Sequence, residues 1–298
     1  MKVVVFGCRI ITADIIKYLI EQGHDIPLVV HHDEERDRIY GNTLVSEYCN
    51  SVNIRNIRFE KEIDAELIKD QRADIIVSSY YRKILKSNVL NLSRLGCINV
   101  HSAILPVGRG PAPTMWNVLN GDTYAGATLH YMDEGIDSGD IIDQKIIRVD
   151  NRTGFELNKY LMFVCRDLIV NNFKSICEGT NKRIVQNHDD AEYCLPFKTS
   201  LRYLVWDNPD KVLNAIRAFT KPYEGAITYT SKNEKLLVWR GIKLPKRNSL
   251  SPPGYFEKTS EGIVVQTNTL PILITEYDVL SPSLRDKGRF VSGAPVAE

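Results

Sequence analysis

Residues 97–142 read CINVHSAILPVGRGPAPTMWNVLNGDTYAGATLHYMDEGIDSGDII, and this stretch decides the fold of the chain. An apolar strand ends at His101, and a second strand over 128–132 leads into an acidic loop that contains Asp137. Residues two apart on a strand project to the same side, so Asn99 and His101 face one pocket. The stretch therefore predicts that an amide, an imidazole and a carboxylate meet where two strand ends converge.

The chemistry of these three side chains indicates direct transfer of an acyl group. Asn99 can donate a hydrogen bond to a developing oxyanion. His101 can take a proton from an attacking amine, while Asp137 fixes the tautomer of the imidazole and stabilises its charged form. None of the three is a plausible covalent nucleophile, which favours transfer between two bound substrates. The alternative is that His101 is a core or turn residue, because Asn-x-His is a common combination.

The N-terminal part of the chain alternates short apolar strands with amphipathic helices. The strands are expected at 3–6, 27–30, 75–78 and 98–100. This alternation is typical of a parallel, doubly wound sheet, in which ligands bind at the carboxyl ends of the strands. Gly7, Tyr80 and His101 follow three of these strands. The pattern therefore predicts a Rossmann-like domain with its site at that edge.

A second module is expected beyond a long helix over 154–177 and a polar linker over 180–199. A short helix over 209–219 is followed by several strand-like runs, at 227–230, 235–239, 262–266 and 272–275. Several short strands in a compact segment are typical of a small β-barrel of the OB type. We therefore expect a catalytic domain with its linker at 1–199 and an OB-like domain at 200–298.

Composition and motifs exclude several classes of function. The formal net charge of +1 gives no general attraction to nucleic acid. One glycine follows the first strand, without G-x-G-x-x-G or a Walker A motif, which disfavours dinucleotide binding and nucleotide hydrolysis. The N-terminus lacks a signal peptide, and no apolar run reaches membrane-spanning length. We expect a cytoplasmic protein with neither a nucleic-acid nor a membrane partner.

Metal binding is not expected either. The six cysteines are scattered without a Cys-x-x-Cys pair, which disfavours structural zinc and a disulfide framework. His31 and His32 precede Asp33-Glu34-Glu35, but adjacent histidines on an extended segment point in opposite directions. A solvated loop is the favoured interpretation of this segment. His130 lies within a strand without an evident partner, and a structural role is expected for it.

The central stretch resembles the 10-formyltetrahydrofolate-dependent formyltransferases. The matching elements are Asn99-x-His101, Leu105-Pro106, Arg109-Gly110, Pro113, Asn120-Gly121-Asp122 and Asp137-x-Gly139. Upstream, Ser79-Tyr80-Tyr81-Arg82 is similar to the same region of the formyltransferase that acts on UDP-4-amino-4-deoxyarabinose. The resemblance implies an enzyme in which His101 is the general base, Asn99 the oxyanion donor and Asp137 the group that orients His101 and favours its protonated form.

The same resemblance implies which residues hold the substrates. The folate is expected on two segments, which comprise Lys83, Ile84, Leu85, Asp133, Glu134, Gly135 and Ile136. Arg109 is a candidate partner for a phosphate or pyrophosphate of the acceptor, unless it only braces its own turn. The arabinose enzyme carries a second arginine where this chain has Pro111, so a ligand contact from that position is not implied here.

The resemblance leaves three acceptors open: an aminoacyl-tRNA, a glycinamide ribonucleotide and a nucleotide-linked amino sugar. Methionyl-tRNA formyltransferases carry a basic insertion where this chain has the acidic segment 31–37, whose carboxylates are expected to repel phosphates. The second module argues against the purine-pathway enzyme, which resembles the catalytic domain alone. The match at Tyr80-Tyr81-Arg82 favours the sugar.

The resemblance therefore points to a nucleotide-sugar N-formyltransferase, and to a homodimer. The first candidate acceptor is dTDP-4-amino-4,6-dideoxyglucose, and the family implies a product for lipopolysaccharide O-antigen or capsule assembly. The alternatives are a methionyl-tRNA formyltransferase and a catalytically silent protein that binds folate or a nucleotide sugar.

Overall fold

The computed structural model describes residues 1–32, 34–59, 65–245, 251–281 and 284–293. Its contacts divide the chain into two compact units. The first unit comprises residues 1–113, 125–147 and 159–194, and the second comprises residues 114–124, 148–158 and 195–298. Each unit is therefore made of three separate stretches of sequence, whereas the sequence predicts two continuous domains that meet between residues 199 and 200.

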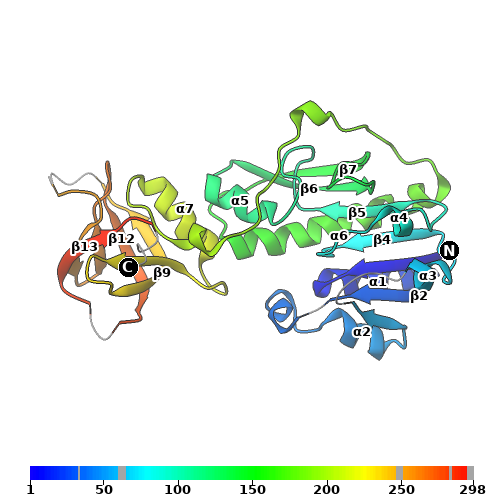
Figure 1. Cartoon of the computed structure of the whole chain (residues 1–298), viewed down its shortest axis with the longest axis horizontal. Helices are drawn as coiled ribbons and strands as arrows, with labels where there is room; N and C mark the ends of the chain where they lie inside the picture. The colour runs from blue at the N-terminus through cyan, green and yellow to red at the C-terminus, as the bar shows by residue number, and fades with distance from the viewer. Residues whose placement is uncertain (33, 60–64, 246–250, 282–283, 294–298) are drawn as a thin grey trace. The chain divides into compact units, whose positions relative to one another are not determined.

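The first unit is built on a seven-stranded sheet with the order β3-β2-β1-β4-β5-β6-β7 (Figure 1). The strands are β1 (Lys2–Gly7), β2 (Asp25–His31), β3 (Asn56–Arg58), β4 (Ile75–Ser79), β5 (Cys97–His101), β6 (Tyr124–Tyr131) and β7 (Ile141–Arg148). The five strands β3-β2-β1-β4-β5 pair with one another in parallel. Strand β6 runs antiparallel to β5. The predicted Rossmann-like class is confirmed, with an antiparallel extension beyond β5.

Burial explains which strands the sequence predicts. The central strand β1 is buried along Val3–Phe6, so its sequence is a continuous apolar run, as in parallel sheets covered on both faces. The sequence pattern does not predict β3 or β7. Both lie at an edge of the sheet, where strands are partly solvated and carry polar residues between the apolar ones.

The helices of the first unit connect these strands. They are α1 (Arg9–Glu21), α2 (Val45–Ser51), α3 (Ala65–Lys69), α4 (Ser87–Leu90) and α6 (Gly154–Glu178), with 3-10 turns η1 (Glu35–Tyr40) and η2 (His188–Asp190). The first turn of α6 belongs to the second unit. Figure 1 shows the long α6 running alongside the strands, and the Tyr18 hydroxyl of α1 donates to the carbonyl of Val170 at 3.1 Å. Gly179 ends α6 with φ +68°, the left-handed conformation expected of a C-terminal glycine.

The second unit contains a closed six-stranded barrel in the order β10-β11-β12-β9-β8-β13. Its strands are β8 (Ala226–Thr230), β9 (Lys235–Lys243), β10 (Tyr255–Thr259), β11 (Gly262–Val265), β12 (Ile272–Val279) and β13 (Lys287–Val291). All six pairs are antiparallel. The expected β-rich C-terminal domain is therefore confirmed, and the structure adds β10 and β13 to the predicted strands.

The barrel core explains how this unit holds together. The rings of Phe256 and Phe290 stack at 4.3 Å between centroids, and Trp206 stacks on Phe290 at 5.5 Å. The unit also contains α5 (Pro113–Asn120), the turn η3 (Thr199–Arg202) and α7 (Pro209–Phe219). The described residues include no helix long and apolar enough to cross a membrane.

Candidate active site

The pairing of β5 with β6 places the first two side chains of the site. The register sets Asn99 opposite His130 and His101 opposite Thr128. The Asn99 Nδ2 atom lies 3.2 Å from His130 Nε2. Asp137 then approaches both imidazoles, because one of its carboxylate oxygens is 3.6 Å from His101 Nδ1 and the other is 3.6 Å from His130 Nε2. The structure thus brings Asn99, His101 and Asp137 together and adds His130.

The hydrogen bond at the far side of the His101 ring assigns its tautomer. His101 Nε2 lies 2.8 Å from the carbonyl oxygen of Gly108. A carbonyl oxygen only accepts, so in the neutral ring Nε2 carries the hydrogen and Nδ1 has the lone pair. Gly108, and not Asp137 as predicted, therefore fixes the tautomer. The Asp137 carboxylate faces Nδ1, the nitrogen that has the lone pair, at 3.6 Å.

His130 is neutral and serves as the hydrogen-bond acceptor of the site. Its Nδ1 donates to the backbone carbonyl of Tyr131 at 2.7 Å, which leaves the Nε2 lone pair to accept from the Asn99 amide. Burial lowers the pKa of His130, and the nearby Asp137 opposes this shift without cancelling it. A lowered pKa favours the neutral imidazole of His130, in which Nε2 is the acceptor. Because His130 occupies one N–H of Asn99, the other amide hydrogen is held in a defined direction.

Asp137 is held in place by the backbone around it. Its own backbone has φ +51°, a left-handed conformation that aspartate tolerates better than most residues. The N–H of Gly110 donates to Asp137 Oδ2 at 2.9 Å, and Gly110 itself has φ +90°. The side chain of Asp137 is 16% exposed, which leaves the carboxylate accessible from one side.

The two segments expected to hold folate present apolar side chains to solvent. Ile84 is 73% exposed and Ile136 is 49% exposed, whereas Leu85 is buried in the sheet core. The loop that carries Ile136 is closed by Asp133, which accepts hydrogen bonds from the Gly135 N–H at 3.0 Å and the Ser138 hydroxyl at 2.6 Å. Of the remaining expected residues, Lys83 and Glu134 are exposed.

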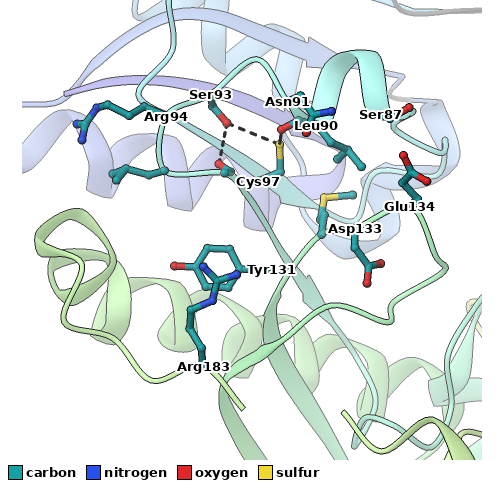
Figure 2. A pocket seen from close by; sticks show the side chains of 13 residues that line it. Ser87, Leu90, Asn91, Ser93, Arg94, Cys97, Tyr131, Asp133, Glu134 and Arg183 are labelled. Carbon is teal, nitrogen blue, oxygen red and sulfur yellow. Dashed lines mark hydrogen bonds between the residues drawn. The ribbon is translucent and has the colours of Figure 1, made fainter. Parts of the chain in front are cut away.

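A pocket of about 520 Å³ lies beside this loop (Figure 2). Asp133 and Glu134 line it together with Leu90, Cys97 and Tyr131, while Asn99, His101 and Asp137 do not. Burial raises the pKa of the Cys97 thiol to about 12, so this thiol stays protonated and apolar in character. The pocket therefore neighbours the expected folate segments without containing the three candidate catalytic residues.

Arg109 is almost completely buried, with 1% of its surface exposed. Its Nε and Nη2 atoms donate to Gln186 Oε1 at 3.2 and 2.8 Å, and Nη1 donates to the Tyr193 hydroxyl at 3.1 Å. Both Nη atoms also lie 3.3 Å from His188 Nδ1. These contacts occupy the whole guanidinium, so the structure favours the bracing role of Arg109 over a contact with a substrate phosphate.

The acidic segment after β2 does not present free carboxylates in its described part. Its three described carboxylates, those of Glu34, Glu35 and Asp37, are each within 4.0 Å of an arginine guanidinium, and the arginines are Arg9, Arg36, Arg38 and Arg82. These ion pairs neutralise part of the negative charge of the segment, and the expectation that it repels phosphates stays a prediction. Asp33 lies outside the described residues.

The two histidines before this segment are buried, which corrects the expected solvated loop. His31 and His32 are 5% and 7% exposed, and the His32 ring packs edge-on against Tyr81 at 4.8 Å between centroids. Across the described ranges, no three or more His, Cys, Asp or Glu side chains are grouped so that they can hold a metal ion.

Sequence comparison identifies the family. A family profile described as Formyl transferase matches residues 1–160, and one described as Formyl transferase, C-terminal domain, matches residues 198–280. The methionyl-tRNA formyltransferase of Pelotomaculum thermopropionicum is 31% identical and covers 100% of this chain and 97% of its own length. That of Agathobacter rectalis is 29% identical, with coverages of 100% and 98%. The chain therefore belongs to the formyl transferase family.

Solved structures share the fold. The Helicobacter canadensis N-formyltransferase in complex with folinic acid and dTDP-3-aminofucose superposes with a TM-score of 0.71 at 19% identity, covering 92% of this chain and 99% of that one. A 4-N formyltransferase from Francisella tularensis gives a TM-score of 0.64 at 20% identity, with coverages of 83% and 98%. At these identities the likeness concerns the fold.

Proposed function

We propose that this chain transfers the formyl group of 10-formyltetrahydrofolate to the amine of a nucleotide-linked amino-deoxysugar. The observation that carries the proposal is the convergence of Asn99, His101 and Asp137 at the paired ends of β5 and β6. A donor amide, a basic nitrogen and a carboxylate at one place suit an amine that attacks a formyl carbon without a covalent enzyme intermediate.

The proposed chemistry follows from the hydrogen bonds of the site. 10-Formyltetrahydrofolate supplies the formyl carbon, and the acceptor supplies the attacking nitrogen. The free N–H of Asn99 donates to the formyl oxygen as negative charge develops there. The lone pair on His101 Nδ1 takes the proton that the amine loses on forming the C–N bond, and Asp137 stabilises the resulting imidazolium at 3.6 Å. The proton then passes to N10 of the folate as its bond to the formyl carbon breaks.

The surface around these residues supports a folate donor. Two exposed isoleucines, Ile84 and Ile136, lie on the two segments expected to hold the folate. Exposed apolar side chains beside a polar site favour a flat aromatic ligand, and both loops also offer backbone hydrogen-bonding groups. We propose that Lys83–Leu85 and Asp133–Ile136 bind the donor, and that the neighbouring pocket of about 520 Å³ extends this surface.

Local charge favours the sugar acceptor over a tRNA. Where methionyl-tRNA formyltransferases carry a basic insertion, this chain pairs the arginines of η1 and its neighbours with carboxylates. A segment whose charges are balanced gains little from releasing phosphate counterions, which is the main source of affinity for nucleic acid. The Tyr80-Tyr81-Arg82 resemblance to the enzyme for an amino sugar supports the same choice.

Methionyl-tRNA is the second candidate acceptor, and one observation favours it. The relatives of about 30% identity over the whole chain are methionyl-tRNA formyltransferases. The proposed donor chemistry at Asn99, His101 and Asp137 is the same for either acceptor.

Mass spectrometry of the acceptor tests the proposal. The protein is mixed with 10-formyltetrahydrofolate and a panel of dTDP-, UDP- and GDP-linked amino sugars, and in parallel with methionyl-tRNA. A formyl mass gain on one sugar, absent with the His101→Gln variant, supports the proposal. A gain on methionyl-tRNA alone overturns the acceptor. No gain on any acceptor, with folate binding retained, favours the catalytically silent binding protein.

A further inference from the structure

The side chain of Gln186 joins the two loops that carry the candidate site. It is 3% exposed, and its Nε2 atom donates to the backbone carbonyls of Asp137 at 2.9 Å and Gly139 at 2.7 Å. Its Oε1 atom accepts from the Arg109 guanidinium at 2.8 and 3.2 Å. Two carbonyl acceptors on one side and a cation on the other fix the orientation of the amide.

Arg109 links Gln186 to the carboxylate of Asp137 through the next residue of the chain. It is followed directly by Gly110, whose N–H donates to Asp137 Oδ2 at 2.9 Å. Asp137 is therefore held at its backbone carbonyl by Gln186 and at its carboxylate by the residue next to Arg109. Its left-handed backbone, with φ +51°, is a conformation that persists only where the surroundings enforce it.

The chain around Gln186 supports the His101 side of the site as well. We call residues 184–194 the return segment, because they lead back from α6 to the loop after β5. The carbonyl of Glu192 accepts from the backbone N–H groups of Gly108 at 3.0 Å and Arg109 at 2.9 Å. Gly108 is the residue whose carbonyl oxygen accepts from His101 Nε2. The return segment thus contacts both elements that orient the imidazole and the carboxylate.

We infer that Gln186 is a positioning residue, which holds Asp137 in register with His101 through Arg109 and Gly110. The return segment is then part of the active-site framework and not only a linker between modules. This inference rests on the proposed function for the role of Asp137, while the arrangement of Gln186, Arg109 and Gly110 can be tested without any substrate.

The amide resonance of Gly110 provides the test. Labelling with carbonyl-¹³C arginine and ¹⁵N glycine selects the Arg-Gly pairs, which in this sequence are Arg109-Gly110 and Arg240-Gly241. Gly241 lies in the barrel strand β9 and is an internal control. The Asp137→Asn variant gives the Gly110 shift for an uncharged acceptor. We expect Gln186→Met to move the Gly110 resonance towards that position and to leave Gly241 unchanged.

A second substitution keeps the test decisive if the first impairs folding. Gln186→Glu retains an acceptor for Arg109 but turns an oxygen towards the carbonyls of Asp137 and Gly139, and we expect the same displacement of the Gly110 signal. The matched control is Gln71→Met, since the Gln71 side chain also donates to a backbone carbonyl, that of Leu67 at 2.8 Å in α3. An unmoved Gly110 signal in the Gln186 variants, or an equal shift in Gln71→Met, overturns the inference.

Kinetics separate positioning from general stability. With the acceptor that the mass-spectrometric test identifies, we expect Gln186→Met to lower kcat by about tenfold to a hundredfold, because a displacement of about 1 Å is costly at a reacting centre. KM for either substrate should change less than about twofold. A rise in KM at constant kcat contradicts positioning. If the wild-type chain formylates no acceptor, the proposed function fails, and the Gly110 signal still decides the structural claim.

Discussion

Two carboxylates of the first unit, those of Asp37 and Asp137, have different partners. The side chain of Asp37 is 1% exposed and is paired with the guanidinium groups of Arg82 and Arg9. The distance from Arg9 Nε to Asp37 Oδ1 is 3.6 Å. The side chain of Asp137 is 16% exposed and faces two imidazoles and one backbone N–H. Both carboxylates follow strands of the same sheet, yet the partners of Asp37 are guanidinium groups and those of Asp137 are imidazoles and a backbone N–H.

Under the proposed function, this difference separates a structural carboxylate, that of Asp37, from one that takes part in the chemistry, that of Asp137. Arginine stays protonated at any pH that a protein meets, so Asp37 has a permanent ion-pair environment. An imidazole can accept a proton, so in the proposed mechanism the environment of Asp137 changes when His101 takes the proton of the amine. The partners of Asp37 therefore keep their charge, whereas His101, beside Asp137, can take part in the proposed proton transfer.

The largest expected effect is that of Asp137→Asn on catalysis. The amide cannot stabilise the imidazolium formed at His101, and we expect kcat to fall on the order of 10²- to 10⁴-fold, the usual contribution of general acid–base catalysis. Formyl transfer to the acceptor is followed by mass spectrometry or by the absorbance of the folate product. If the Asp137→Asn variant keeps more than about a tenth of the activity, the distinction between the two carboxylates is broken.

The next effect is that of Asp37→Asn on stability. Asp37→Asn removes the charge that Arg9 and Arg82 share. Since Arg82 is 29% exposed and also pairs with Glu34, we expect a loss of about 1.5 to 3 kcal/mol in the free energy of unfolding, the usual contribution of a hydrogen bond to a charged group. Urea denaturation measures this loss. The matched control is Glu35→Gln, since Glu35 pairs with Arg38 but its side chain is 79% exposed. Exposed pairs contribute at most about 1 kcal/mol, so an equal loss in both variants contradicts the contrast.

The smallest effect concerns pH and His130. Burial lowers the pKa of His130 below its ordinary value of 6.5, so on acidification the unfolded chain takes up this proton before the folded chain does. Stability is therefore lost as the pH falls below about 6.5, by at most about 1.4 kcal/mol per pH unit for one proton. We expect the unfolding free energy of His130→Gln to fall less steeply over this range.

Because His24 also titrates differently in the folded and unfolded chains, the pH slope of His130→Gln must be subtracted from that of the unaltered protein. Burial and the neighbouring N-terminus lower the pKa of His24 too, but this residue is unchanged in both proteins, so their difference isolates His130. Identical pH slopes would show that His130 binds protons equally in the folded and unfolded chains, and would contradict the lowered pKa of its buried imidazole.

Part of the site could be predicted from the sequence because it depends on local geometry. Asn99 and His101 share a face since strand residues alternate with a period of two. The acidic loop that ends at Asp137 follows directly from the end of the next strand. His130 lies within a strand that the sequence also predicts. Pairing this strand with residues 97–101 in antiparallel register would have placed His130 opposite Asn99 and so in the site.

Other features could not be predicted because their partners are distant in the sequence. Asp37 meets Arg82 across 45 positions, so the acidic appearance of its segment gives no hint that it is buried and neutralised. Gln186 lies in a polar stretch that is typical of a linker, and its partner Arg109 is 77 residues away. Polar side chains give no periodic signal of burial, since only their hydrogen-bond partners make burial tolerable.

The sequence by itself determined the Rossmann-like class, the β-rich second module and three residues with the chemistry of acyl transfer. The two modules follow from hydrophobic periodicity, which is a local property of the chain, whereas the three residues are singled out by their residue types together with the family resemblance of residues 97–142. Only the tertiary structure decided that Gly108 orients His101, that His130 stays neutral beside Asn99, and that Arg109 is buried. Each of these depends on which atoms meet after folding, because burial and hydrogen-bond geometry arise from contacts between distant segments.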